Sequence, residues 1–283
     1  MEFTMQISTK VNGNPSSRVS VYDRGLLYGD GVFRTMRVSA GRVLCWQLHY
    51  QKLQYDCAAI GIICPDSTLL AQELQSLLQQ YPDGVAKIII TRGLQSERGY
   101  RPLSAGLPTR IISISPLPQF PDKFEVEGVR IRVCQTKLAY QPRLAGLKHL
   151  NRLENVMAAA EWDDVRIVEG VMLDWAGNVI AGTRCNIFAV HAGQIYTPDL
   201  SHCGVAGVQR DRVIDWATKN NVPCKIKLFN LAELIAADEI FLINSVIGLW
   251  PVREFIDQNG QNETWSQFPM SKQIQKWLNR ANT

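Results

Sequence analysis

The sequence has few residues of the kinds that hold metal ions. It contains four histidines and seven cysteines among 283 residues, and no two cysteines have the CxxC spacing of a zinc or redox motif. Structural zinc sites need several such ligands close together. The sequence therefore predicts no metal site, and an odd, unpatterned set of thiols is typical of a protein in a reducing compartment.

Long apolar runs, a secretory signal at Met1 and clusters of basic residues are also missing. A membrane-spanning helix needs about 20 consecutive apolar residues, and a nucleic-acid-binding surface gathers lysine and arginine. The formal net charge is only +4, which suits a small anionic ligand better than a polyanion. We therefore expect a cytoplasmic protein that binds neither a membrane nor nucleic acid.

The composition is that of an ordinary globular protein, with 46% hydrophobic and 20% charged residues. Three prolines fall within the six residues 116–121, which is typical of a linker. We expect an α+β protein of two domains, residues 1–115 and 125–283, joined by a linker at 116–124.

The periodic placement of apolar residues predicts the helices and strands. Residues 69–81 have one apolar face and follow Asp66 and Ser67, either of which is a candidate N-cap. A β-branched run at 85–91 predicts a buried strand. The other predicted helices, strands and hairpins are at 46–60, 109–115, 129–134, 172–180, 186–196, 204–220, 238–245 and 271–278.

The stretch from Leu147 to Glu154 places a lysine ahead of a predicted helix. Apolar residues recur at helical spacing from Asn151, which we take as the N-cap. The positive end of a helix dipole and burial both disfavour an ammonium, so Lys148 is a candidate for a neutral amine. A lysine needs a neutral amine to link to an aldehyde or to take up a proton. The alternative is an ordinary solvated lysine.

A second candidate site is the glycine-containing loop after the strand at 85–91. It holds Arg92, Arg98 and Arg101, and guanidinium forks bind carboxylates. A solvated surface loop is the alternative. Farther on, small residues precede the helix predicted at 204–220, and they leave backbone N–H groups for a phosphate.

These and other motifs fall in one order along nearly the whole chain. The ordered set comprises Asp23-Arg24-Gly25, Tyr28-Gly29-Asp30-Gly31-Val32-Phe33, Lys148-His149-Leu150-Asn151-Arg152-Leu153, Asn186-Ile187-Phe188, Gly204 to Arg210, and Asn244 to Val252. In this order they resemble the fold-type IV pyridoxal-phosphate enzymes, which include branched-chain and D-amino-acid aminotransferases and aminodeoxychorismate lyases. The loop Arg98-Gly99-Tyr100 and the segment from Gly146 to Glu154 look most like the lyase branch.

The resemblance implies a two-domain fold-type IV architecture, with pyridoxal 5'-phosphate in the inter-domain cleft, and a homodimer. It implies that Lys148 links to the cofactor and moves protons, and that the Thr35 hydroxyl relays a proton. Arg92 and Arg98 would bind substrate carboxylates, and Asn244 would be a further substrate contact. The residues expected to hold the cofactor phosphate are Lys52, Val208, Gln209 and Ser245.

Two positions depart from the family pattern. Lys52 stands where the family usually has an arginine, so the charge is kept and the fork is lost. Ala181 stands where the family has a glutamate that keeps the ring nitrogen of the cofactor protonated. Three explanations are open for Ala181. The reaction needs less electron withdrawal because its product is aromatic, or Thr183 or a water serves the nitrogen, or the protein has lost activity.

The lyase branch implies conversion of 4-amino-4-deoxychorismate to 4-aminobenzoate and pyruvate, a step of folate synthesis. A D-amino-acid or branched-chain aminotransferase is the main alternative. Ala181 argues against it, because transamination needs a strong electron sink. The remaining alternatives are a pyridoxal-phosphate-binding protein without turnover and an α/β domain without a cofactor.

Overall fold

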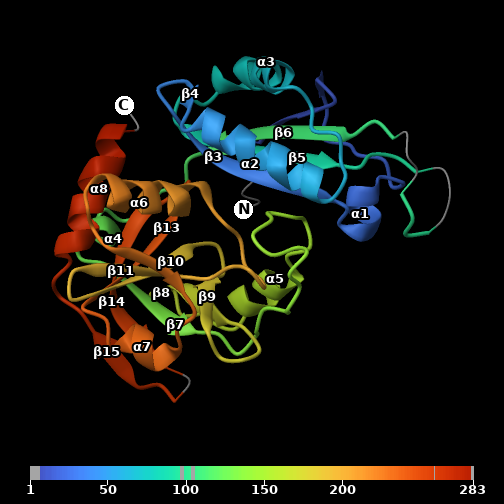
Figure 1. Cartoon of the computed structure of the whole chain (residues 1–283). Helices are drawn as coiled ribbons and strands as arrows, with labels where there is room; N and C mark the ends of the chain where they lie inside the picture. Colours follow the sequence, from blue (N-terminus) through green and yellow to red (C-terminus); the bar gives the residue numbers. More distant parts are fainter. Residues whose placement is uncertain (1–6, 96–98, 103–105, 258, 282–283) are drawn as a thin grey trace. The chain divides into compact units, whose positions relative to one another are not determined.

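The chain packs as two compact units. The computed structural model describes residues 7–95, 99–102, 106–257 and 259–281. The units are Met1–Gln119 with Lys148–Asn151, and Phe120–Leu147 with Arg152–Thr283. Each contains a sheet and helices, which confirms the expected α+β class (Figure 1). The segment that includes Lys148 thus packs with the first unit, while the expected linker at 116–124 stays a prediction.

The first unit is built on a six-stranded sheet with the order β2-β1-β6-β5-β3-β4. All neighbouring strands in it run antiparallel. Its strands are β1 (Ser8–Val11), β2 (Asn14–Pro15), β3 (Gly31–Ser39), β4 (Arg42–Val43), β5 (Gly84–Thr91) and β6 (Thr109–Pro116). Its helices are α1 (Arg24–Tyr28), α2 (Trp46–Ala59) and α3 (Ser67–Leu78).

Alternation along strand β3 decides what each face of this sheet carries. Val32, Met36 and Val38 are fully buried and pack with α2 and α3, which lie along one face of the sheet (Figure 1). The intervening residues Phe33 and Thr35 are half-buried and point to the opposite face. The helix-covered face is therefore the apolar core of the unit, and the other face carries polar and aromatic side chains.

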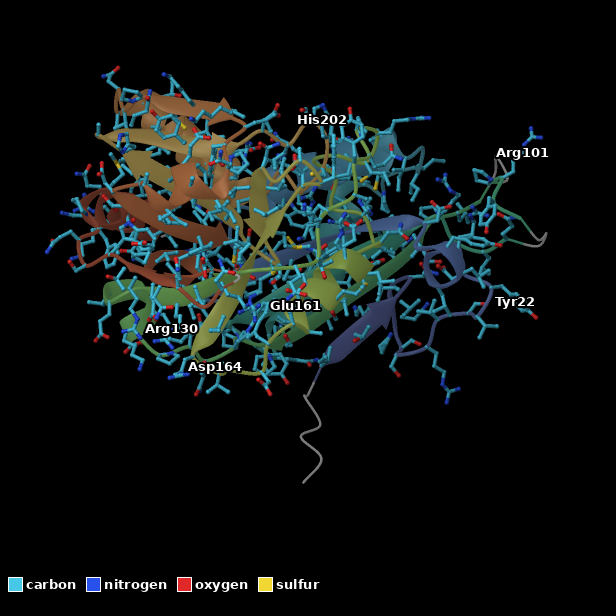
Figure 2. All side chains as sticks on the ribbon, turned by 90° about the horizontal axis from the view of Figure 1, so that it is seen from below. Tyr22, Arg101, Arg130, Glu161, Asp164 and His202 are labelled. Atoms are coloured by element: carbon cyan, nitrogen blue, oxygen red, sulfur yellow. The ribbon has the colours of Figure 1, made fainter. Side chains whose placement is uncertain are left out.

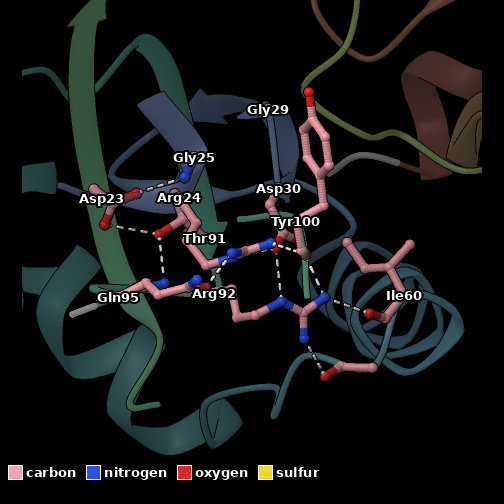
Figure 3. Close-up of polar contacts among 12 residues, drawn as sticks. Asp23, Arg24, Gly25, Gly29, Asp30, Ile60, Thr91, Arg92, Gln95 and Tyr100 are labelled. Atoms are coloured by element: carbon pink, nitrogen blue, oxygen red, sulfur yellow. Dashed lines mark hydrogen bonds and ion pairs between the residues drawn. The ribbon is translucent and has the colours of Figure 1, made fainter. Parts of the chain in front are cut away.

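A largely buried carboxylate joins the start of β3 to the end of β5. Arg24 Nε lies 2.7 Å from Asp30 Oδ2, and Arg92 holds the same carboxylate with Nε at 2.7 Å and Nη2 at 3.0 Å. Figure 3 shows both guanidinium groups directed at Asp30. Arg92 also donates to Ile60 O and Gly61 O, just after α2, at 2.6 Å each. One carboxylate therefore fastens α1, β3, β5 and the end of α2 together.

Arg24 extends this network into the loop after β5. Its Nη2 donates to Tyr100 O at 2.7 Å and its Nη1 to Gly99 O at 3.2 Å. A buried arginine needs its charge neutralised and its donors used, and Asp30 and these carbonyls do both. Burial opposes ionisation of Asp30, but hydrogen bonds and charge from Arg92 and Arg24 outweigh it and lower its pKa.

The second unit contains a nine-stranded sheet with the order β12-β11-β10-β13-β14-β7-β8-β9, and β15 pairs with β14. Its strands are β7 (Val129–Val133), β8 (Ile167–Leu173), β9 (Val179–Gly182), β10 (Asn186–His191), β11 (Gln194–Pro198), β12 (Cys224–Lys227), β13 (Glu239–Asn244), β14 (Gly248–Ile256) and β15 (Asn262–Thr264). Its helices are α4 (Lys123–Val126), α5 (Leu153–Ala159), α6 (Val208–Lys219), α7 (Leu231–Ile235) and α8 (Pro269–Ala281). Within the described ranges, no helix of either unit has the length and apolar character of a membrane span.

Alternation along β13 separates two apolar layers of the second unit. Phe241 and Ile243 pack with α6 and α8, and Phe241 stacks on Phe188 with ring centroids 4.9 Å apart. Ile240 and Leu242 point into another apolar cluster, which includes residues of α7. The strand is therefore buried on both faces, as the continuous apolar run in its sequence suggests.

The sequence located most elements correctly, but it misplaced the helix after Lys148. Helix α5 begins at Leu153 with Arg152 as its N-cap, so the prediction that Asn151 caps this helix is wrong. Asn151 instead donates to Gly29 O at 3.1 Å. The reason is a contact within the first unit, which holds the Asn151 side chain against the chain just after α1.

We expect Asp30→Asn to lower the free energy of unfolding by about 3 kcal/mol near pH 7, because it leaves two arginines without their shared partner. The folded pKa of Asp30 is lowered, so its contribution is complete above the unfolded value of about 3.9 and is lost as the pH falls through the folded pKa. Urea unfolding of wild type and variant at about pH 7 and about pH 3 measures this difference.

The control for this prediction is Asp215→Asn, which breaks an exposed pair with Lys219 and should cost less than about 0.5 kcal/mol. If the stability difference between wild type and Asp30→Asn does not shrink at acid pH, the two-arginine assignment is wrong.

Candidate functional site

Residues 148–150 run along strand β3 as a short antiparallel extension of the first unit's sheet. Phe33 N donates to Lys148 O at 2.9 Å, and Leu150 N donates to Gly31 O at 3.0 Å. A Cβ on Gly31 would lie 2.6 Å from Ile90 O of β5 and 2.8 Å from the Leu150 side chain, so the close approach of strand β5 requires glycine there. Strand pairing therefore fixes the main chain of Lys148.

The amine of Lys148 lies over the ring of Phe33, with Nζ 4.5 Å from the ring centroid. Phe33 and Thr35 share one face of β3 because they are two residues apart. Lys87, directly opposite Thr35 on β5, brings its Nζ to 5.2 Å from the same centroid. The structure thus collects two amines, an aromatic ring and a hydroxyl on one face of the first unit's sheet. Lys148 and Thr35, the two residues expected to be catalytic, are among them.

Lys87 is a candidate that the sequence reasoning missed. It is the one charged residue of the strand at 84–91, and its neighbours Ala86 and Ile88 are buried in the core. A lone lysine at an outward position of an apolar strand was a signal that this strand has a functional face. Its position opposite Thr35, however, depends on how β3 and β5 pair, which the sequence did not predict.

A buried carboxylate lies behind Lys148. Asp56 of α2 forms an ion pair with Arg34 of β3 and accepts the backbone N–H of Lys148 at 3.1 Å. Arg34 Nη2 also donates to Lys52 O at 3.0 Å. Burial raises the pKa of Asp56, although the charge of Arg34 and the Lys148 N–H act against that rise. Lys52, expected to hold the cofactor phosphate, therefore belongs to the same cluster of charges.

Of the two arginines expected to bind substrate carboxylates, the structure describes only Arg92. Arg92 directs its guanidinium at Asp30 and at the two carbonyls after α2 described above. Through these contacts Arg92 stabilises the fold of the first unit. Arg98 lies outside the described residues. A role for either in substrate binding stays a prediction.

Asn244, the further expected substrate contact, ends strand β13 in the second unit. Its Oδ1 accepts from Val246 N at 2.8 Å and from Ile247 N at 2.9 Å, which shapes the turn before β14. Its Nδ2 lies 3.3 Å from Cys185 Sγ. The side chain therefore already positions the turn that contains Ser245, and its contact with substrate stays a prediction.

The start of α6 has the features of a phosphate site. Its N-cap is Gly207, no side chain caps this end, and the first backbone N–H groups are those of Val208 and Gln209. Asn186 holds the segment that leads into α6, because its Oδ1 accepts from Gly207 N at 3.2 Å and its Nδ2 donates to Val205 O at 2.8 Å. A Cβ at position 207 would lie 2.3 Å from that Oδ1. These donors fit the phosphate of pyridoxal phosphate.

The position of the missing glutamate is Ala181, which is buried in β9 opposite Met172 of β8. A carboxylate does lie nearby in the second unit. Glu169 of β8 accepts from Thr183 N at 2.9 Å and from the Thr183 hydroxyl, and its side chain packs against the backbone of Gly182. Thr183, one group considered for the ring nitrogen, therefore already gives its hydroxyl proton to Glu169.

Comparisons with known proteins identify the family of this chain. The sequence profile of the family Amino-transferase class IV matches residues 31–255. The aminodeoxychorismate lyase of Vibrio harveyi is 34% identical over 274 residues, which cover 96% of this chain and 99% of that protein. The crystal structure of 4-amino-4-deoxychorismate lyase from Pseudomonas aeruginosa is 43% identical, with a TM-score of 0.90 and coverage of 96% of this chain and 98% of that one.

An aminotransferase is also among the relatives. The D-alanine aminotransferase of Bacillus licheniformis is 26% identical over 270 residues, 93% of this chain and 91% of that protein. The resemblance read from the ordered motifs is thus confirmed, and so is the fold-type IV architecture. This chain belongs to the class IV aminotransferase family.

Proposed function

We propose that this protein is a pyridoxal-phosphate-dependent lyase that converts 4-amino-4-deoxychorismate to 4-aminobenzoate and pyruvate. The observation that carries the proposal is the sheet face on which the Lys148 and Lys87 amines lie over the Phe33 ring and which also carries Thr35. Similar proteins named as this lyase support the choice of substrate.

Residues of this chain provide for the aldehyde and the phosphate of the cofactor. When bound, pyridoxal phosphate supplies an aldehyde that links to amines and a ring that withdraws electrons from the attached carbon. Lys148 is the amine that links to it. The Val208 and Gln209 N–H groups and the Ser245 hydroxyl of the second unit would hold its phosphate. Lys52 stays a prediction from the family resemblance.

The proton transfers are assigned to the same sheet face. The Lys148 amine would take the proton from the substrate ring carbon that bears the nitrogen. Loss of that proton and of the enolpyruvyl oxygen makes the ring aromatic. Lys148 or Thr35 returns a proton to the departing pyruvate enol, because the two lie on one side of the sheet. Lys87 places a positive charge where the anionic substrate can bind.

Ala181 favours the lyase over an aminotransferase. A neutral, apolar side chain cannot keep the cofactor ring nitrogen protonated, so electron withdrawal by the ring is weaker. Transamination depends fully on that withdrawal. Formation of an aromatic product supplies driving force of its own, so the lyase reaction tolerates the loss.

We expect purified protein supplied with pyridoxal phosphate to show the visible absorption band of lysine-linked cofactor and to form 4-aminobenzoate from aminodeoxychorismate. Lys148→Ala should lose that band and at least about 1,000-fold in turnover, because it removes both the linking amine and the base. The exposed Lys219→Ala is the control and should keep both.

Absorbance spectra and a fluorescence assay for 4-aminobenzoate measure these outcomes. Turnover by Lys148→Ala at the wild-type rate would refute the proposal. Glutamate formed from 2-oxoglutarate and an amino acid, without 4-aminobenzoate, would instead identify an aminotransferase.

We expect Lys87→Met to raise KM for aminodeoxychorismate about 10- to 100-fold, because a charge-assisted contact to a carboxylate contributes roughly 1.5–3 kcal/mol. Its kcat should change much less, and Lys87→Arg should recover most of the affinity because it keeps the charge. Steady-state kinetics of the two variants measure this. An unchanged KM in Lys87→Met would remove Lys87 from the site.

The proposal includes a homodimer in the cytoplasm. Exposed apolar side chains gather around α1 in the first unit, with Tyr22 67% and Leu26 66% exposed. Leu94 joins them because it forms a bridge with Asp23, just before α1. Figure 2 shows Tyr22 at the same end of the first unit as Arg101. Isolated exposed apolar residues are normal on a protein surface, whereas a group of them marks an interaction site. The patch around α1 therefore supports a subunit contact there.

We expect light scattering to give about twice the chain mass of 31.8 kDa. Leu26→Glu should shift the protein toward monomer, because a charge in an apolar interface is desolvated without a partner. Val165→Glu is the control, since Val165 is an apolar residue that is 91% exposed and belongs to the second unit. Dimers that resist Leu26→Glu would exclude this surface as the interface.

A further inference from the structure

Two charges lie inside the apolar core of the first unit. Arg34 is 2% exposed and Asp56 is 1% exposed, and their side chains form an ion pair. Residues on either side of them along the chain are apolar core residues, such as Met36 on β3 and Leu53 and Cys57 on α2. An ion pair in such surroundings adds little stability compared with apolar side chains of similar size. Its presence therefore needs another reason.

A third partner of Asp56 supplies that reason. The oxygen that meets Arg34, Oδ2, also accepts the backbone N–H of Lys148 at 3.1 Å. On the other side of the same residue, Lys148 O accepts from Phe33 N at 2.9 Å. The main chain of Lys148 is thus held by a helix through its N–H and by a strand through its carbonyl.

We propose that Asp56, held in place by Arg34, is a positioning residue that fixes the main chain of Lys148 and so directs its amine over Phe33. This inference rests on the proposed function, in which that amine carries out the chemistry. Asp56 acts through Lys148, and its contacts are the Lys148 N–H and Arg34. Arg34 also donates to Lys52 O, so the ion pair supports two residues that the proposed function uses. A displacement of about 1 Å at a reacting group is enough to cost about 100-fold in rate.

The decisive variant is the double substitution Arg34→Met/Asp56→Leu. It leaves no unpaired buried charge, so the protein should keep the urea midpoint of the wild type. The Lys148 N–H loses its acceptor, whereas the Leu150 N–H keeps Gly31 O. We expect amide hydrogen exchange at Lys148 in the full chain to become at least about 10-fold faster relative to Leu150. We expect kcat to fall about 10- to 100-fold with KM changed less than about 3-fold.

Two further variants separate positioning from general stability. Asp56→Asn keeps an oxygen that can accept from both Arg34 and Lys148, so it should retain slow exchange at Lys148 and most of kcat. Glu73→Leu/Arg110→Met removes another largely buried ion pair of the same unit, 2.8 Å at its shortest, and should leave Lys148 exchange and kcat unchanged.

The possible results are distinct. Unchanged Lys148 exchange in Arg34→Met/Asp56→Leu, or faster exchange without loss of kcat, would overturn the inference. The inference would also be overturned if Asp56→Asn lost as much kcat and as much exchange protection at Lys148 as the double variant, because the oxygen acceptor would then not matter. Wild-type protein without lyase turnover would refute the proposed function alone, since exchange at Lys148 is measured without cofactor or substrate.

Discussion

The candidate site depends on the pairing of the Lys148 segment with strand β3. Two backbone hydrogen bonds join residues that are far apart in the sequence, and they bring the Lys148 amine over Phe33. Backbone pairing suits this task because it fixes a residue without using its side chain. The pairing thus fixes the main chain of Lys148, while Thr35 and Lys87 gain their places from the same sheet.

The first unit uses its buried arginines as structural cations. Arg24 and Arg92 share Asp30 and fasten the loops at one end of the sheet, while Arg34 holds Asp56 behind Lys148. Each of these arginines is matched by a carboxylate, because an unpaired charge inside a protein is strongly destabilising. An arginine next to a functional motif therefore need not touch a ligand. In this protein Lys148 and Lys87, which lie on the face of the sheet opposite α2 and α3, are better suited to contact a ligand.

In the second unit, Ala181 stands where the family resemblance implies a glutamate. With Ala181 in place of a glutamate, the strongest electrostatic aid to the cofactor ring is missing. Glu169 keeps a carboxylate in the neighbourhood, but it is committed to Thr183 and to nearby backbone. The start of α6 presents backbone N–H groups within its own unit, and Asn186 and Gly207 shape the segment that leads to them. The proposed phosphate contacts and the position expected to face the ring nitrogen therefore involve separate residues, and the resemblance marks one departure in each, Lys52 and Ala181.

The sequence by itself determined many of the helices and strands, because apolar periodicity follows directly from the geometry of each element. It missed strand β3, because the glycines around the start of that strand are typical of a tight turn. It also determined the family, because the order of the motifs survives along nearly the whole chain, and it singled out Lys148 as a candidate. Only the tertiary structure decided which charges meet. It turned Arg92 toward Asp30, drew Asn151 away from the helix it was expected to cap, and set Lys87 opposite Thr35. These outcomes depend on strand register and on contacts between distant segments, and no local pattern of residues encodes the partner that a side chain will find.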